Sequence, residues 1–265
     1  MKGIDISNHN GEIKFASVKS SGVELIYIKA TEGTTYQDPM LNEYYNGANS
    51  EGLKTGFYHF LVGTSEPESQ AQNFYDNIKG KTNDLKPCLD IEKNGFDVMD
   101  FALRFIKKFE SLSSLPLCIY SYPYFINNNL DSRLAQYPLW VANYGVQTPI
   151  PNNVWGDSYV GHQYSETGNV NGINGNVDLD TFYDGILVNK IDKAYVVTQY
   201  LPNGYNGDGS FQGVDLNYVL SYMPGVRCYA LGDSKGVWIE TQMLTMEKCL
   251  ELKQTLGSWF YDIRQ

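Results

Sequence analysis

Short apolar runs alternate with amphipathic stretches over roughly the first 185 residues. The apolar runs predict strands over residues 3–7, 24–30, 55–60, 87–92, 117–122, 139–144, 159–165 and 177–182. The amphipathic stretches predict helices near residues 13–20, 40–51, 66–78 and 96–111. Strands that alternate with helices form a parallel sheet, and eight such strands close into a barrel. The last three strands are joined by short loops without clear helices. The pattern therefore predicts an α/β fold, an irregular eight-stranded β/α barrel with fewer helices than strands.

The pattern changes after about residue 188. We expect strands over residues 194–201, 226–231, 237–243 and 258–263, and helices over 215–223 and 245–256. Asp215 is suited to cap the first of these helices, and the glycine-rich turn at 232–236 is suited to a hairpin. The order β-α-β-β-α-β predicts a small α+β domain over residues 189–265, which follows a barrel domain over residues 1–188.

The polar residues of the predicted barrel strands gather near the carboxyl ends of these strands. They are Asp5, Lys29 with Glu32 just beyond, His59, Asp90, Glu92, Tyr120, Asn143 and Gln163. In a parallel barrel these ends form one rim, and barrel enzymes carry out their chemistry there. Asp178 lies early in its strand and fits this arrangement less well. The repetition predicts an active site at the rim.

Two of these carboxyl groups stand two residues apart, in the segment Leu89-Asp90-Ile91-Glu92. Successive strand side chains alternate faces, so Asp90 and Glu92 point the same way, roughly 7 Å apart. Each raises the pKa of the other. One protonated acid beside a second carboxyl group is the arrangement that a glycosidase needs.

The overall charge restricts the partners. The chain carries 20 Lys and Arg against 30 Asp and Glu, a net charge of −10. The predicted barrel holds −9 of this charge, and the predicted small domain is nearly neutral at −1. A chain this acidic is not expected to bind nucleic acid, which requires clustered basic residues. No apolar run reaches 18 residues, so we expect no membrane insertion.

The cysteines and histidines show no metal-ligand spacing. Cys88, Cys118, Cys228 and Cys249 are scattered along the chain, and we expect buried free thiols. The three histidines form no local motif either. The sequence therefore predicts neither a metal site nor a cofactor.

Seven segments, in order, resemble the glycoside hydrolase family 25 lysozymes, the N-acetylmuramidases found among bacterial autolysins and phage endolysins. The matching segments are Gly3–Ser7, Ile28–Gly33, Gly56–Phe60, Leu89–Glu92, Leu139–Tyr144, Gln163–Ser165 and Val177–Asp180. The resemblance covers the predicted barrel, residues 1 to about 185. It departs from the usual family pattern at His162 and Asn10, which concern substrate fit.

The resemblance implies cleavage of the β-1,4 bond between N-acetylmuramic acid and N-acetylglucosamine in peptidoglycan, with retention of configuration. It also implies that Asp5, Asp90, Glu92 and Asp178 are the active-site carboxylates. Glu92 is expected to act as general acid and then as general base. Either Asp90 or Asp178 attacks or stabilises the anomeric carbon, or the substrate's 2-acetamido group attacks while Asp90 stabilises the oxazolinium. We favour the second route, because the substrate carries the N-acetyl group.

Further rim residues are expected to contact the sugar. These are Lys29, Glu32, Tyr58, His59, Tyr120, Trp140, Asn143, Gln163 and Tyr164. Aromatic side chains present flat apolar faces to sugar rings. His59 is expected to orient a hydrogen bond, since no Ser or Cys nucleophile accompanies it in a known arrangement.

The small domain resembles, in element order only, sporulation-related repeat domains that bind glycan strands. We expect it to bind the bacterial cell wall, with homo-oligomerisation as the alternative role. The protein is expected to be made in the bacterial cytoplasm without a signal peptide and to act at the wall after release. A chitinase-like N-acetylglucosaminidase and a non-enzymatic glycan-binding lectin remain alternatives for the barrel.

Overall fold

The computed structural model describes residues 1–188, 194–201 and 213–264. The chain divides into two compact units, Met1–Val188 and Asn189–Gln265. Within the described part of the chain, no helix is long and apolar enough to span a membrane.

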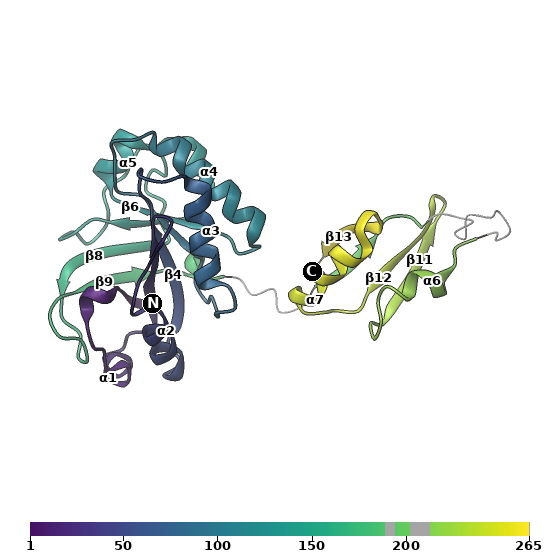
Figure 1. Cartoon of the computed structure of the whole chain (residues 1–265), viewed down its shortest axis with the longest axis horizontal. Coiled ribbons are helices and arrows are strands. Elements are labelled where there is room, and N and C mark those ends of the chain that lie inside the picture. The colour runs from purple at the N-terminus through teal and green to yellow at the C-terminus, as the bar shows by residue number, and fades with distance from the viewer. Residues whose placement is uncertain (189–193, 202–212, 265) are drawn as a thin grey trace. The chain divides into compact units, whose positions relative to one another are not determined.

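The first unit is a closed barrel of eight strands (Figure 1). Its strands are β1 (Lys2–Ile6), β2 (Leu25–Glu32), β4 (Lys54–Phe60), β5 (Cys88–Asp90), β6 (Cys118–Ser121), β7 (Leu139–Ala142), β8 (Gly161–Gly168) and β9 (Val177–Phe182). Hydrogen bonds between β1 and β2 close the sheet, and the two-residue strand β3 (Tyr36–Gln37) is added to β2 at its edge. The predicted eight-stranded barrel is confirmed.

Helices cover the barrel unevenly. They are α1 (Phe15–Ser20), α2 (Leu41–Ser50), α3 (Pro67–Ile78), α4 (Val98–Leu112) and α5 (Pro123–Asn129). The helices α3 and α4 pack side by side (Figure 1). The helix α5 was not predicted, because a seven-residue helix that begins with Pro123 is too short to show a period. Residues 1–188 hold five α-helices for eight barrel strands, as the irregular pattern predicts.

The strand directions differ from a fully parallel barrel at one place. All neighbouring barrel strands from β1 through β2 and β4 to β8 pair in parallel, but β9 pairs antiparallel with both β8 and β1. The short Gly- and Asn-rich link between β8 and β9 allows a hairpin and leaves no room for a crossover helix. The expectation of a parallel eighth strand is wrong.

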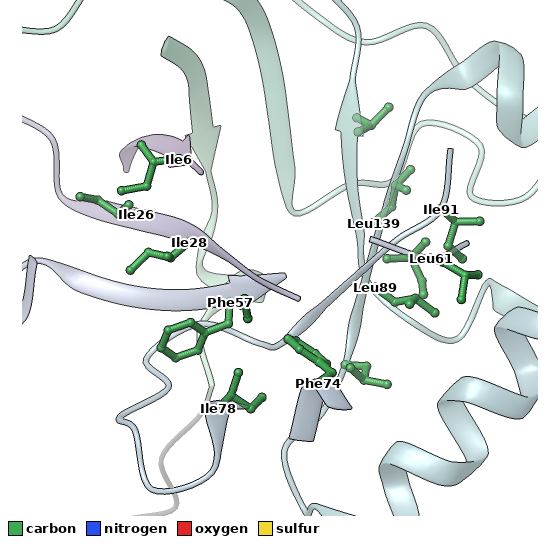
Figure 2. Packing of buried hydrophobic residues seen from close by; sticks show 14 of the residues in the cluster. Ile6, Ile26, Ile28, Phe57, Leu61, Phe74, Ile78, Leu89, Ile91 and Leu139 are labelled. Carbon is green, nitrogen blue, oxygen red and sulfur yellow. The ribbon is translucent and has the colours of Figure 1, made fainter. Parts of the chain in front are cut away.

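Along most of β2, side chains alternate between the helices and the barrel interior, and a bulge between Lys29 and Thr31 interrupts the pattern. On β2, Ile26 and Ile28 belong to the large cluster between strands and helices, whereas Leu25 and Tyr27 belong to the interior cluster. Figure 2 shows Ile26, Ile28, Phe57 of β4 and Phe74 of α3 within the large cluster. This two-residue period decides which polar side chains reach the active site.

The interior is narrow at its base, and glycine makes room there. Phe182 of β9 is fully buried between Gly3 of β1 and Gly161 of β8. A Cβ on either glycine would stand 2.6 Å from the Phe182 ring. Above this layer, Tyr27 stacks on Trp140 with ring centroids 4.7 Å apart. These aromatic side chains form the floor on which the polar rim residues rest.

The second unit has the predicted β-α-β-β-α-β order. Its elements are β10 (Tyr195–Thr198), α6 (Leu216–Leu220), β11 (Cys228–Asp233), β12 (Gly236–Thr241), α7 (Met246–Leu256) and β13 (Phe260–Arg264). The sheet order is β11-β12-β10-β13, and the pairs are antiparallel. A separate core includes Val196, Ile239 and Leu252. The predicted loop over 203–213 lies almost entirely outside the described residues.

Candidate active site

Four of the five carboxyl groups that line a cavity of about 350 Å³ at the carboxyl end of the parallel strands were predicted from the sequence. They belong to Asp5 of β1, Asp90 of β5, Glu92 just beyond β5, and Asp178 of β9. Because β9 runs antiparallel, its beginning lies at the rim where the other strands end. Asp178 is the register partner of Asp5. The reversed strand therefore accounts for the early position of Asp178.

A chain of hydrogen bonds holds one side of the cavity. The hydroxyl groups of Tyr120 and Tyr144 both donate to Gln163 Oε1, each over 2.8 Å. Gln163 Nε2 in turn donates to Asp5 Oδ2 over 2.6 Å. Asp5 thus receives a donor whose orientation is set by two tyrosines, which fixes its carboxyl plane.

Burial raises the pKa of the active-site acids. The pKa of Asp5 and of Asp90 lies well above the usual range, chiefly through burial and then through neighbouring carboxylates. Burial also raises the pKa of Glu92 and raises that of Asp178 to about 6. Lys29 acts in the opposite direction on Asp90 and Glu92. So many close acids cannot all be ionised at neutral pH, and the cluster retains protons available for general acid catalysis.

Two further hollows adjoin the cavity. One, of about 810 Å³, shares His9 and Lys29 with it and includes Glu32. The Lys29 Nζ–Glu32 Oε2 ion pair is 2.8 Å long. The other hollow, of about 460 Å³, shares Glu92 with the cavity and includes Asn143. The central cavity therefore shares lining residues with both neighbouring hollows, and Glu92 borders two of the three, an arrangement suited to a linear polymer.

The structure brings most of the predicted substrate-binding residues to these hollows. Lys29, Tyr58, Tyr120, Trp140 and Gln163 line the central cavity, and Glu32 and Asn143 line its neighbours.

Trp140 differs from its expected role as a platform for sugar. Its ring is buried, stacks on Tyr27 and donates from Nε1 to Asp180 Oδ1 over 2.9 Å. Trp140 supports the cavity from below.

Two predicted sugar contacts do not reach the cavity. His59 is fully buried on the helix side of β4, where its ring packs on Phe105 and its nitrogens bond Thr31 Oγ1 and Gln70 Oε1. The prediction that His59 binds substrate is wrong, because alternation along β4 directs positions 58 and 60 inward and position 59 outward. Burial lowers the pKa of His59 to about 3, so the ring is neutral. Tyr164 packs edge-on against His162 and lines none of the three hollows.

Several cavity residues were missed from the sequence. Ser7, His9, Phe60, Tyr144 and Glu166 line the cavity as well. They lie in loops or at strand ends, whose spatial neighbours depend on barrel closure.

Asp180 was also missed as a functional residue, although it stands two positions from Asp178 on the same face of β9. The alternation rule applied to Asp90 and Glu92 would have found it.

The thiols lie apart from this chemistry. All four cysteines are free; Cys88, Cys118 and Cys249 are buried and Cys228 is half-buried. Among the described residues, no three His, Cys, Asp or Glu side chains are grouped to hold a metal ion.

A closed β/α barrel with paired, partly protonated carboxyl groups at its mouth defines the class of barrel glycoside hydrolases. The sequence model of the Glycosyl hydrolases family 25 matches residues 4–173. The chain belongs to this family.

Three known proteins illustrate the similarity. The autolytic lysozyme of Clostridium acetobutylicum is 42% identical over 225 residues, which cover 83% of this chain and 66% of that protein. Lysozyme M1 of Streptomyces globisporus is 34% identical over 200 residues, 69% of this chain and 67% of that protein. The crystal structure of the bacterial lysozyme of Streptomyces coelicolor is 32% identical, with a TM-score of 0.64, and covers 69% of this chain and 91% of that chain. The chain thus spans about two thirds of the length of these two curated relatives.

Proposed function

We propose that the chain is a muramidase that cleaves the β-1,4 bond between N-acetylmuramic acid and N-acetylglucosamine in peptidoglycan. The observation that carries this proposal is the meeting of Asp5, Asp90, Glu92 and Asp178 in one cavity with open hollows on both sides. A series of hollows accepts sugar units on either side of the bond that is cut. The relatives named lysozymes support the same substrate.

Glu92 is the general acid and base of this proposal. Its side chain is half-buried and faces both the cavity and the neighbouring hollow, where it reaches the oxygen between two sugar units. Burial raises its pKa, which favours the protonated form that releases the leaving sugar. The resulting carboxylate then takes a proton from the incoming water, which gives a retaining reaction.

Asp90 stabilises the positive charge that develops on the sugar. Its Oδ1 is buried and has no hydrogen-bond partner within residues 1–188, 194–201 and 213–264. A 2-acetamido N–H of the substrate supplies the missing donor and stabilises the ionised form of Asp90. The ionised Asp90 then favours an oxazolinium intermediate. Direct attack by Asp90 or Asp178 is the alternative route.

Mass spectrometry of digested peptidoglycan tests the bond that is cut. A muramidase leaves muramic acid at the new reducing end. A glucosamine end, or faster cleavage of chitin than of peptidoglycan, would favour the chitinase-like alternative. A wild-type protein that binds walls but leaves their turbidity unchanged would favour the lectin.

Glu92→Gln tests the acid. We expect its rate of wall lysis to fall about 10²- to 10⁴-fold, the usual contribution of a positioned acid or base. Glu43→Gln, at an exposed position of α2, is the matched control and should lyse walls normally. Near-normal lysis by Glu92→Gln would end the assignment.

The second unit is proposed to bind the wall. Tyr200, Trp238, Tyr261 and Arg264 line a hollow of about 260 Å³, together with residues of β10. Tyr261 is 54% exposed, and Tyr200 packs edge-on against Trp238. Exposed tyrosine rings and a half-buried tryptophan ring beside a cation and hydroxyl groups suit a saccharide, since the rings present apolar faces and polar edges together.

Wall-binding assays with full-length variants test this role. Tyr261→Ala should weaken sedimentation with purified walls, whereas Tyr229→Ala, equally exposed at 50% but outside the hollow, should not. Removal of residues 189–265 should reduce wall attachment and spare cleavage of soluble fragments. Unchanged attachment after this removal, with a smaller oligomer in size-exclusion chromatography, would favour self-association.

We propose that the protein is a lysin of the endolysin or autolysin type that acts at the bacterial wall.

A further inference from the structure

One buried carboxyl group beneath the cavity has no assigned role. Asp180 is 0% exposed, and its Oδ1 accepts a hydrogen bond from Trp140 Nε1 over 2.9 Å. Its Oδ2 has no hydrogen-bond donor among the residues that the structure describes. A buried carboxylate oxygen without a donor is costly, so the group requires an explanation.

The geometry places a second carboxyl group beside this oxygen. Asp180 stands opposite Gly3 in the β1–β9 register, one pair below Asp5 and Asp178. Asp5 and Asp180 lie on neighbouring strands, and their carboxyl groups come within hydrogen-bonding reach of one another. Two carboxylates cannot bond each other when both are ionised, whereas one proton between them satisfies both.

We propose that Asp180 is a positioning residue that remains protonated in the active enzyme and donates its proton from Oδ2 to Asp5. Asp5 then accepts two donors, Gln163 Nε2 and the Asp180 hydroxyl, and stays ionised at the base of the cavity. Asp180 holds the proton because it is fully buried, whereas Asp5 is 7% exposed and lines the cavity. The negative charge of the pair therefore lies on Asp5, which faces the substrate.

The surrounding groups agree with this division. The charged groups that face Asp180 are Asp5 and Asp178, both acidic, and burial together with these neighbours holds the pKa of Asp180 well above its usual range. Burial raises the pKa of Asp5 as well, but the hydrogen bond between the two carboxyl groups lowers the pKa of Asp5 and raises that of Asp180. The other titratable side chains nearby are the buried Tyr27 of β2 and Tyr164 of β8, which are neutral below pH 10. On β7, Trp140 donates to Oδ1, so it leaves only Oδ2 for the proton.

The substitutions Asp180→Asn and Asp180→Leu separate positioning from packing. The Asn amide accepts from Trp140 through its oxygen and donates to Asp5 through its nitrogen at every pH, whereas Leu fills similar space without a donor. With Leu, the pKa of Asp5 rises because the carboxylate loses one of two donors, and the acid becomes protonated at a higher pH.

The experiment measures kcat on peptidoglycan from pH 4 to 9, with thermal unfolding as the check of folding. Because kcat is measured on peptidoglycan, this experiment rests on the proposed muramidase function. The kcat of Asp180→Asn should stay within about threefold of the wild-type value, and its decrease at low pH should begin at the same pH. The kcat of Asp180→Leu should be about 10²-fold lower, and its decrease at low pH should begin at a higher pH. An Asn variant as weak as the Leu variant, or a fully active Leu variant, would overturn the proposal.

Carboxyl ¹³C NMR of aspartate-labelled full-length protein tests the proton without using activity. The wild-type spectrum should contain one carboxyl signal that is missing from the spectrum of Asp180→Asn. That signal should keep the chemical shift of a protonated carboxyl group between pH 5 and 8. Titration of that signal with an ordinary aspartate pKa would refute the proposal even if the enzyme is active. A protein that cleaves no peptidoglycan but shows the protonated signal would refute the proposed function and leave the assignment of the proton intact. If Asp180→Leu does not fold, the NMR result by itself decides whether Asp180 is protonated.

Discussion

Asp178→Asn should make the barrel more stable at neutral pH, although it removes an active-site carboxyl group. Burial, together with the nearby Glu166, raises the pKa of Asp178 from 3.8 to about 6. The folded chain therefore binds this proton more tightly than the unfolded chain does. The contribution of Asp178 to stability is complete below pH 3.8 and is lost as pH rises through about 6. Asparagine resembles the protonated acid and avoids this loss.

The magnitude follows from the size of the shift. About two pKa units correspond to about 3 kcal/mol at 1.36 kcal/mol per unit. Asp178 is only half-buried at the edge of an open cavity, so water screens part of this cost and we expect about 1.5 kcal/mol. For a domain of this size, 1 kcal/mol corresponds to about 2–4 °C, so the melting temperature should rise by about 3–6 °C at pH 7.5.

Scanning calorimetry at pH 3.5 and pH 7.5 measures the effect. Asp178→Asn should show its gain at pH 7.5 and almost none at pH 3.5, where the wild-type acid is protonated in the folded chain and mostly protonated in the unfolded chain. Asp157→Asn, at an exposed position of the same unit, should change neither value. An equal gain at both pH values would show that packing rather than charge is responsible, and no gain at pH 7.5 would refute the reasoning.

Three further substitutions test the packing around the cavity. His59→Leu should leave KM unchanged and cost about 2–4 kcal/mol in urea unfolding, because buried Thr31 Oγ1 loses its partner and Gln70 Oε1 loses one of its two donors. Since the pKa of His59 is lowered to about 3, the wild-type protein should lose stability as pH falls below 6.5, and the variant should lose less. Tyr144→Phe removes one of two hydroxyl donors to Gln163, so kcat on peptidoglycan should fall about fivefold at unchanged melting temperature. Gly3→Ala brings a Cβ to 2.6 Å from Phe182 and should cost about 1–3 kcal/mol in urea unfolding. The described packing would be contradicted by a raised KM in His59→Leu, by a wild-type kcat in Tyr144→Phe, or by wild-type stability in Gly3→Ala.

Local periodicity was sufficient for most of the fold. The predicted runs correspond to the eight barrel strands, with ends that differ by a few residues, and the second unit has its predicted order. Alternation also placed Asp90 and Glu92 on one face, which the cavity lining agrees with. These features depend on neighbours within one strand or helix, so the chain alone specifies them.

His59 shows where periodicity was not enough. Its position near a strand end suggested the rim, yet it faces α3 and α4. A residue near the rim does not necessarily point into the cavity. The direction of its side chain depends on which face of the strand becomes the interior of the barrel. Alternation relative to Tyr58 was available from the sequence, but the inner face was known only after closure of the sheet.

The amino-acid sequence by itself determined the strands, the family motifs and the acidic pair Asp90 and Glu92 at the end of β5. The short link between β8 and β9 permits a hairpin, and the tertiary structure decided that β9 runs antiparallel, which brings Asp178 next to Asp5 and Asp180 beneath them. The reason is physical: side-chain alternation in a strand and hydrogen bonds in a helix are local, whereas strand direction and inner face are decided when β1 pairs with both β2 and β9 to close the barrel. Only then do acids more than 170 residues apart in the chain line one cavity.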